Sequence, residues 1–91
     1  MSCCKRYDAN LESAHGHSSG HRDEVLASEL CGCFCCRKNF PPSEIEDWID
    51  EHDGVGTTAL CPRCGIDSVI GSRSGFVLTP EFLLEMHDYW F

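Results

Sequence analysis

The pattern of apolar and polar positions divides the chain into a polar beginning and a body of mixed helical and strand character. Residues 1–20 contain few large apolar side chains, so we expect a flexible polar arm there. From residue 21 onward, apolar positions recur at the spacings of short helices and strands. The pattern predicts a single α+β domain over 21–91, with about three short helices packed around a small β unit.

The first helix is predicted over residues 21–30. Val25, Leu26 and Leu30 form a narrow apolar stripe along it, and acidic residues near its beginning suit the positive end of the helix dipole. Gly32 is well placed to end the helix.

A second helix is predicted over residues 44–51. Ser43 and Glu46 have the spacing of a capping box, which satisfies backbone N–H groups at a helix N-terminus. The apolar positions recur at i, i+3 and i+4 and are Ile45, Trp48 and Ile49. The opposite face is acidic, and it is either a solvated face or a docking surface for a basic partner.

The third helix is predicted to begin at Pro80, with Thr79 as its N-cap. Its apolar side is formed by Phe82, Leu83, Met86 and Trp90. Strands are predicted over 37–40 and 57–60, with a turn at 54–56, and 67–70 is predicted to form a hairpin with 76–78.

Two CxxC motifs are the strongest candidates for a metal-binding site in the sequence. The first CxxC motif is Cys33 and Cys36, and the second is Cys61 and Cys64. A two-residue gap lets one tight turn direct two sulfurs at one metal ion, and Gly65 can adopt the left-handed conformation that ends such a turn. The 24 residues between the motifs exceed the usual spacing, and an inserted short helix would account for the excess.

We predict that these four cysteines hold one structural Zn²⁺ ion, because thiolates supply soft, anionic ligands at tetrahedral corners. The same ligands could hold iron. The cysteine pattern is also compatible with a disulfide framework, or with a thioredoxin-like redox pair at Cys61 and Cys64. Cys31 is a reserve ligand, and Cys35 is a second spare thiol beside the site.

The N-terminal arm contains further metal-binding residue types. Cys3 and Cys4 are adjacent, which makes chelation of one ion difficult, so we expect two free exposed thiols. His15, His17 and His21 either bind a transition metal weakly or are solvated side chains of the arm.

Composition narrows the range of partners and compartments. The chain of 91 residues has a formal net charge of −8, which disfavours binding to nucleic acid and favours a basic or apolar protein surface. We expect a cytoplasmic protein, because no apolar segment resembles a signal peptide or a membrane span, and the eight cysteines suit a reducing compartment. A chain this short has a modest core, so we expect the metal-free form to be partly unfolded.

Four sequence blocks resemble a group of short bacterial cytoplasmic proteins without an assigned activity. The blocks are HSSGHR (17–22), CGCF (31–34), SEIEDW (43–48) and TALCPRCGIDSVIG (58–71). The last block is the most specific, and the resemblance extends over about three quarters of the chain, from His21 onward. It implies a zinc-ribbon-like protein, and the CxxC motifs alone resemble zinc ribbons that serve as rigid docking platforms.

The function expected from the sequence is that of a non-catalytic structural-zinc module acting as a protein-interaction or adaptor protein. Four protein ligands leave no coordination position for water or substrate. One alternative is an HNH-like nuclease with a structural zinc, in which His52 between the motifs would act in catalysis. A third hypothesis is a thiol- or zinc-based redox sensor that uses Cys31 or Cys35.

Overall fold

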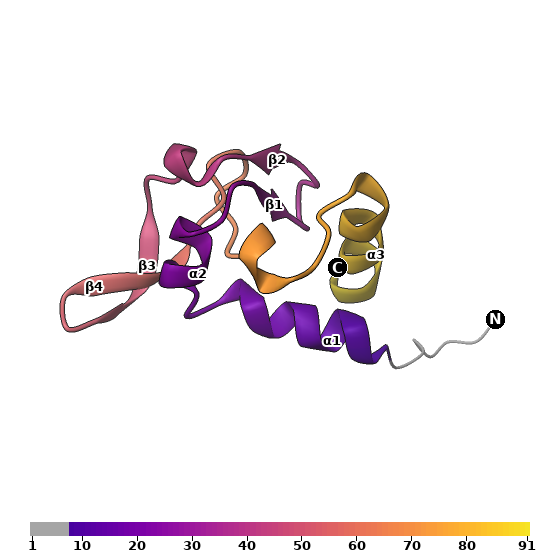
Figure 1. Cartoon of the computed structure of the whole chain (residues 1–91), viewed down its shortest axis with the longest axis horizontal. Coiled ribbons are helices and arrows are strands. Elements are labelled where there is room, and N and C mark those ends of the chain that lie inside the picture. The colour runs from indigo at the N-terminus through magenta and orange to yellow at the C-terminus, as the bar shows by residue number, and fades with distance from the viewer. Residues whose placement is uncertain (1–7) are drawn as a thin grey trace.

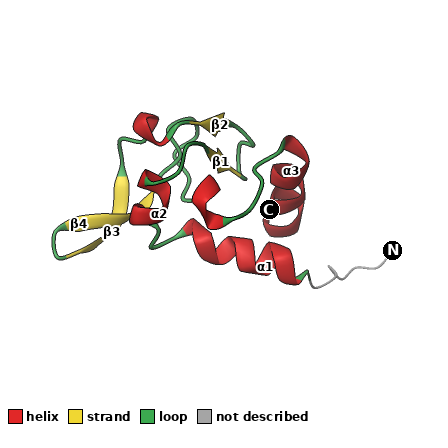
Figure 2. Ribbon diagram, viewed as in Figure 1, coloured by secondary structure: helices red, strands yellow, loops and turns green. Residues whose placement is uncertain are grey.

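The computed structural model describes residues 8–91, which form two small antiparallel sheets surrounded by short helices (Figures 1 and 2). The helices are α1 (Ala9–His15), α2 (Arg22–Leu26) and α3 (Pro80–Trp90). The strands are β1 (Cys31–Cys33), β2 (Asn39–Phe40), β3 (Trp48–His52), β4 (Val55–Ala59) and β5 (Val69–Gly71). Single 3₁₀ turns occur at Gly16–Ser18, Pro42–Glu44 and Ser72–Ser74. The α+β fold class expected from the sequence is confirmed.

The three-stranded sheet forms the centre of the molecule, with strand order β2–β1–β5. Both pairings are antiparallel, and Cys33 at the end of β1 lies opposite Val69 of β5. All residues of β1 and β5 are buried. Helix α3 approaches β1 closely at Gly32, where the Leu83 side chain takes the space that a Cβ atom would need.

The second sheet is a two-stranded hairpin of β3 and β4. Asp53 and Gly54 connect the strands with φ angles of 54° and 81°, as a type I′ turn requires. The helix predicted over 44–51 is therefore wrong. After a single 3₁₀ turn the backbone is already extended at Ile45, and the Asp-Gly pair favours a hairpin more strongly than the i, i+3, i+4 spacing favours a helix.

The N-terminal part of the chain is more ordered than the sequence indicates. Asp8 caps helix α1 by accepting hydrogen bonds from the backbone N–H groups of Asn10 and Leu11. Leu11 and Ala14 are buried, so the prediction of a flexible arm is wrong for residues 8–20. These apolar residues belong to the same buried cluster as residues of α3, at the other end of the chain. No local sequence pattern indicates such a contact. Residues 1–7, with Cys3 and Cys4, lie outside the described part.

Two further predictions require correction. Helix α2 covers only residues 22–26 of the predicted 21–30. The hairpin predicted for 67–70 and 76–78 does not form, because β5 pairs with β1 instead and is followed by a 3₁₀ turn that ends at Gly75 with a φ of 94°. Helix α3 begins as predicted, since the Thr79 hydroxyl accepts a hydrogen bond from the backbone N–H of Phe82.

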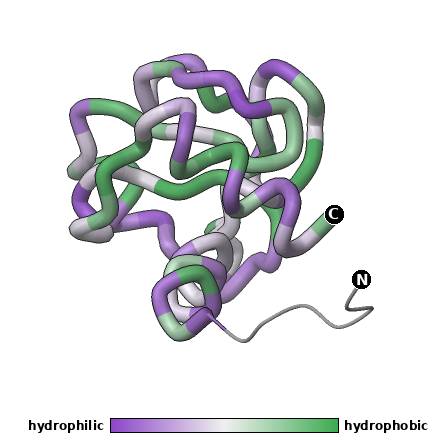
Figure 3. Tube along the Cα trace, turned by 90° about the vertical axis from the view of Figure 1, so that its right-hand side faces the viewer, coloured by the Kyte–Doolittle hydropathy of each residue, from purple (hydrophilic) through white to green (hydrophobic). Residues whose placement is uncertain are grey.

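The apolar core has two parts. One surrounds the first and second CxxC motifs and includes Val25, Phe40 and Val69, with Trp48 packed against it. The other includes Phe34, Ile70, Leu83 and Met86 and lies where α1 meets α3. Short apolar and polar stretches alternate along the trace (Figure 3).

Candidate metal centre

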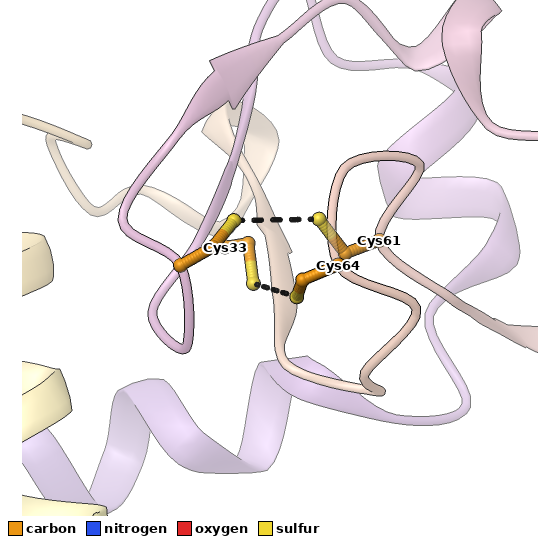
Figure 4. Close-up of side chains that lie close together, drawn as sticks. Cys33, Cys61 and Cys64 are labelled. Atoms are coloured by element: carbon orange, nitrogen blue, oxygen red, sulfur yellow. Dashed lines mark hydrogen bonds between the residues drawn. The ribbon is translucent and has the colours of Figure 1, made fainter.

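The structure brings the four predicted cysteines together. The first CxxC motif begins at Cys33, the last residue of β1, and the second follows β4. Their four Sγ atoms all lie within 4.8 Å of one another. Two contacts join the motifs across the site, Cys33 Sγ to Cys64 Sγ and Cys36 Sγ to Cys61 Sγ, each at 3.7 Å. In Figure 4 the sulfurs of Cys33, Cys61 and Cys64 converge from two facing turns.

Both motifs direct a backbone N–H group at the sulfur of their first cysteine. The Cys35 N–H donates to Cys33 Sγ, and the Arg63 N–H donates to Cys61 Sγ, each at 3.3 Å. These hydrogen bonds favour the anionic form of the sulfur that accepts them.

The two turns also close in the same way. The fourth residue after the first cysteine donates its N–H to that cysteine's carbonyl, from Arg37 to Cys33 at 2.8 Å and from Gly65 to Cys61 at 2.9 Å. These donors have φ angles of 62° and 82°, both in the left-handed region. The left-handed conformation expected of Gly65 is confirmed, and the two motifs are repeats of one local structure.

The two sulfur–sulfur contacts between the motifs have the length expected in a tetrahedral metal site. Zinc–sulfur bonds of about 2.3 Å at tetrahedral angles place sulfurs about 3.8 Å apart. The contacts of 3.7 Å agree with that value and exceed a disulfide bond of about 2.0 Å. Four thiolates therefore suit Zn²⁺, or iron in the same geometry, and would hold either ion without a further ligand.

Proton affinities at the site differ among the cysteines. Burial alone would raise the pKa of Cys33, but hydrogen bonds from the Ser68 hydroxyl, at 3.0 Å, and from backbone groups lower it below the ordinary value. Burial, with the charge of Cys33 nearby, raises the pKa of Cys61 to about 11 and that of Cys64 to about 12. A cation is consequently needed to hold all four sulfurs as thiolates at neutral pH.

The spare cysteines lie outside this group. Cys31 is fully buried in β1, and burial raises its pKa to about 11, so it is a structural thiol of low reactivity. Cys35 is half-buried in the turn of the first CxxC motif. Among residues 8–91, Cys33, Cys36, Cys61 and Cys64 form the one group of Cys, His or acidic side chains with the spacing of a metal site.

The three N-terminal histidines have separate structural contacts. The His15 ring packs on Trp90 with centroids 4.0 Å apart, and His17 Nδ1 lies 2.9 Å from a Glu24 carboxylate oxygen. His21 is buried. Its Nδ1 donates to the His17 carbonyl at 2.6 Å, and its Nε2 accepts from the Ala59 N–H at 3.0 Å. Sequence reasoning missed this role because nothing near His21 in the chain indicates its contact with β4.

Comparison of the chain with protein-family models, with curated proteins and with solved structures gives no match.

Proposed function

We propose that this protein is a non-catalytic module in which one structural Zn²⁺ ion holds the body in shape for binding another protein. The observation that carries the proposal is the group of four sulfurs, which two structurally repeated turns bring within 4.8 Å of one another. A complete set of four protein ligands leaves no coordination position for water or substrate. The ion joins chain segments whose own secondary structure is short, which is the usual role of a structural metal in a small domain.

The surroundings of His52 give the nuclease alternative no support. The His52 side chain is 84% exposed at the end of β3, and its ion-pair contact within residues 8–91 is with the similarly exposed Asp53, at 3.7 Å. A general base is ordinarily held in a cleft by surrounding groups. The exposed His52 side chain is not held in this way. For the redox-sensor alternative, Cys31 is a poor candidate because its burial shields the thiol from oxidants. Of the two spare cysteines, only Cys35 remains a candidate sensor thiol.

We further propose a reducing compartment such as the cytoplasm. The site uses free thiols, and such compartments preserve them. None of the helices within residues 8–91 has the length and apolar character needed to span a bilayer.

The metal proposal is tested on protein purified without chelators. We expect about one zinc ion per chain by elemental analysis, and a Co²⁺-substituted form with the thiolate absorption of a tetrahedral site. Chelation should abolish the cooperative melt, because zinc binding in such sites is worth on the order of 10 kcal/mol. An apo form that melts as sharply as the metal-bound form would contradict the proposal.

Two serine variants identify the ligands. Cys64→Ser should lower the zinc content and the melting temperature, because it removes one of the four sulfurs. Cys35→Ser is the matched control, since it changes a cysteine in the other turn that lies outside the group. Equal zinc loss in both variants would mean that the ligand set is wrong.

A further inference from the structure

The β3–β4 hairpin is set apart from the rest of the molecule. It forms a sheet of its own and projects from the body at the end opposite α3 (Figure 1). Every residue from Ile49 to Val55 is exposed. The type I′ turn at Asp53 and Gly54 matches the natural twist of paired strands. Within β3 the extended backbone is interrupted at Asp50, which has a φ of 57°, and pairing with β4 continues on both sides of it.

The two edges of this hairpin differ. The outer edge of β4 is covered by residues 20–22. The His21 N–H donates to the Thr57 carbonyl at 2.8 Å, and His21 Nε2 accepts from the Ala59 N–H at 3.0 Å. Among residues 8–91, no strand pairs with the outer edge of β3. An uncovered edge is a template onto which another extended segment can add.

The segment that contains β3 and its turn is strongly acidic. Residues 39–62 contain six acidic side chains and no Lys or Arg. Glu44 forms an ion pair with Arg63 at 3.0 Å. The other five are exposed and are Glu46, Asp47, Asp50, Glu51 and Asp53. Within residues 8–91, none of these five pairs with a Lys or Arg.

The negative charge of this segment favours some binding partners over others. A second copy of the chain would place acidic side chains opposite acidic side chains, and nucleic acid would bring phosphates, so both are repelled. A lysine- or arginine-rich segment is attracted. The exposed apolar side chains of Ile49 and Val55 can pack against the alkyl parts of its basic side chains.

The base of the hairpin is attached to the metal centre. The Leu60 N–H, adjacent to Cys61, donates to the Asp47 carbonyl at 3.0 Å. Trp48 at the start of β3 packs against the core cluster that contains Cys33 and Cys61. The metal centre thereby fixes the direction in which the hairpin leaves the body.

We propose that the uncovered edge of β3 binds an extended, lysine- or arginine-rich segment of another protein, which adds to the hairpin as a third strand. The inference deepens the proposed function by specifying the chemistry of the partner, and it rests on that function because the zinc centre holds the base of the hairpin.

The test uses the zinc-loaded full chain and a fluorescent short peptide of alternating lysine and valine. We expect saturable binding by anisotropy at low salt, with ¹⁵N-amide shift changes confined to residues 46–57. Glu46→Lys/Glu51→Lys should weaken binding about tenfold or more, because two attractions become repulsions. Shift changes centred on α3, or no binding, would overturn the proposal.

Matched controls separate strand addition from general attraction between opposite charges. Glu81→Lys/Glu85→Lys makes the same change in net charge on exposed positions of α3 and should leave the affinity within about twofold of wild type. The same peptide with alternate backbone amides N-methylated should bind at least about tenfold more weakly, because it cannot donate to a strand edge. Equal weakening by both charge variants, or equal binding of the methylated peptide, would contradict strand addition.

Two further measurements distinguish the possible failures. A labelled single-stranded oligonucleotide should not bind, and if it binds through residues 46–57, the partner class is wrong. Metal content is measured on the same sample. Zinc present without peptide binding would reject this inference alone, whereas absence of zinc would reject the proposed function.

Discussion

At the scale of single residues, the two CxxC turns show how backbone conformation brings cysteine sulfurs together. Both turns place their fifth residue in the left-handed region, and the occupants are Arg37 and Gly65. Glycine adopts this conformation freely, whereas an L-residue loses about 1 kcal/mol. Arg37 is kept there by the N–H donation to the Cys33 carbonyl that closes the turn.

We therefore expect Gly65→Ala to lower the free energy of unfolding by about 1 kcal/mol, because the added Cβ is strained at a φ of 82°. The cause is strain and not crowding, since a Cβ at Gly65 would meet nothing within 4 Å. Urea unfolding of the zinc-loaded protein measures the effect. Gly16→Ala is the control, since Gly16 also has open space but a right-handed φ of −61°, and it should not be destabilised.

At the scale of elements, the segment after the first CxxC motif shows competition between helix and strand. Ile45, Trp48 and Ile49 have helical spacing, yet Trp48 and Ile49 lie in β3, opposite Ala59 and Thr58. Ser43 lies in a 3₁₀ turn that has no side-chain cap. Pairing with β4 satisfies the backbone of this segment, so the predicted capping box has no helix to cap.

The two predicted caps should accordingly respond differently to alanine. Thr79→Ala should lower the free energy of unfolding by about 1 kcal/mol, because it removes the hydroxyl that accepts from the Phe82 N–H at the start of α3. Ser43→Ala should leave stability unchanged, since Ser43 is exposed and caps nothing. Thermal melts of both zinc-loaded variants decide the matter, and a similar loss in both would contradict the assignment of the caps.

At the scale of the whole molecule, the N-terminal segment joins parts of the fold that are distant in sequence. Helix α1 packs on α3, where the Tyr89 hydroxyl donates to a Glu12 carboxylate oxygen at 2.9 Å. His21 then links the His17 carbonyl to the Ala59 N–H of β4. One buried imidazole therefore connects the segment that follows α1 to the β3–β4 hairpin.

This imidazole predicts a pH dependence of stability. Burial lowers the pKa of His21 below its usual 6.5, and its Nε2 accepts a hydrogen bond and so must stay unprotonated. Well above about pH 6.5 the folded and unfolded states are both neutral at this position. As the pH falls below that value, the unfolded state binds the proton first, so stability is lost with acidification.

The dependence is measured by urea unfolding of the zinc-loaded protein between pH 7.5 and 5.5, values chosen about one unit to either side of the usual histidine pKa. His21→Gln should be less stable at the higher pH and show a shallower loss on acidification. His52→Gln, at an exposed position, should follow the wild-type curve and so control for zinc release. A His21→Gln curve parallel to wild type would show that another group causes the acid loss.

The sequence alone determined the features that depend on neighbouring residues. The two-residue gaps and Gly65 predicted the turns and the four cysteines that come together, and Thr79-Pro80 predicted the start of α3. The Asp53-Gly54 pair is also a hairpin signal, but our prediction placed only a turn at 54–56 and did not use it.

Only the tertiary structure decided which segments meet. Ordering of α1 depends on α3, the burial of His21 depends on β4, and β5 pairs with β1 and not with its neighbour in the chain. Short elements such as these gain little stability locally and take the conformation that their distant contacts stabilise. Contacts of that kind leave no periodic pattern in the sequence, which is why the grouping of the four cysteines could be predicted while most of its surroundings could not.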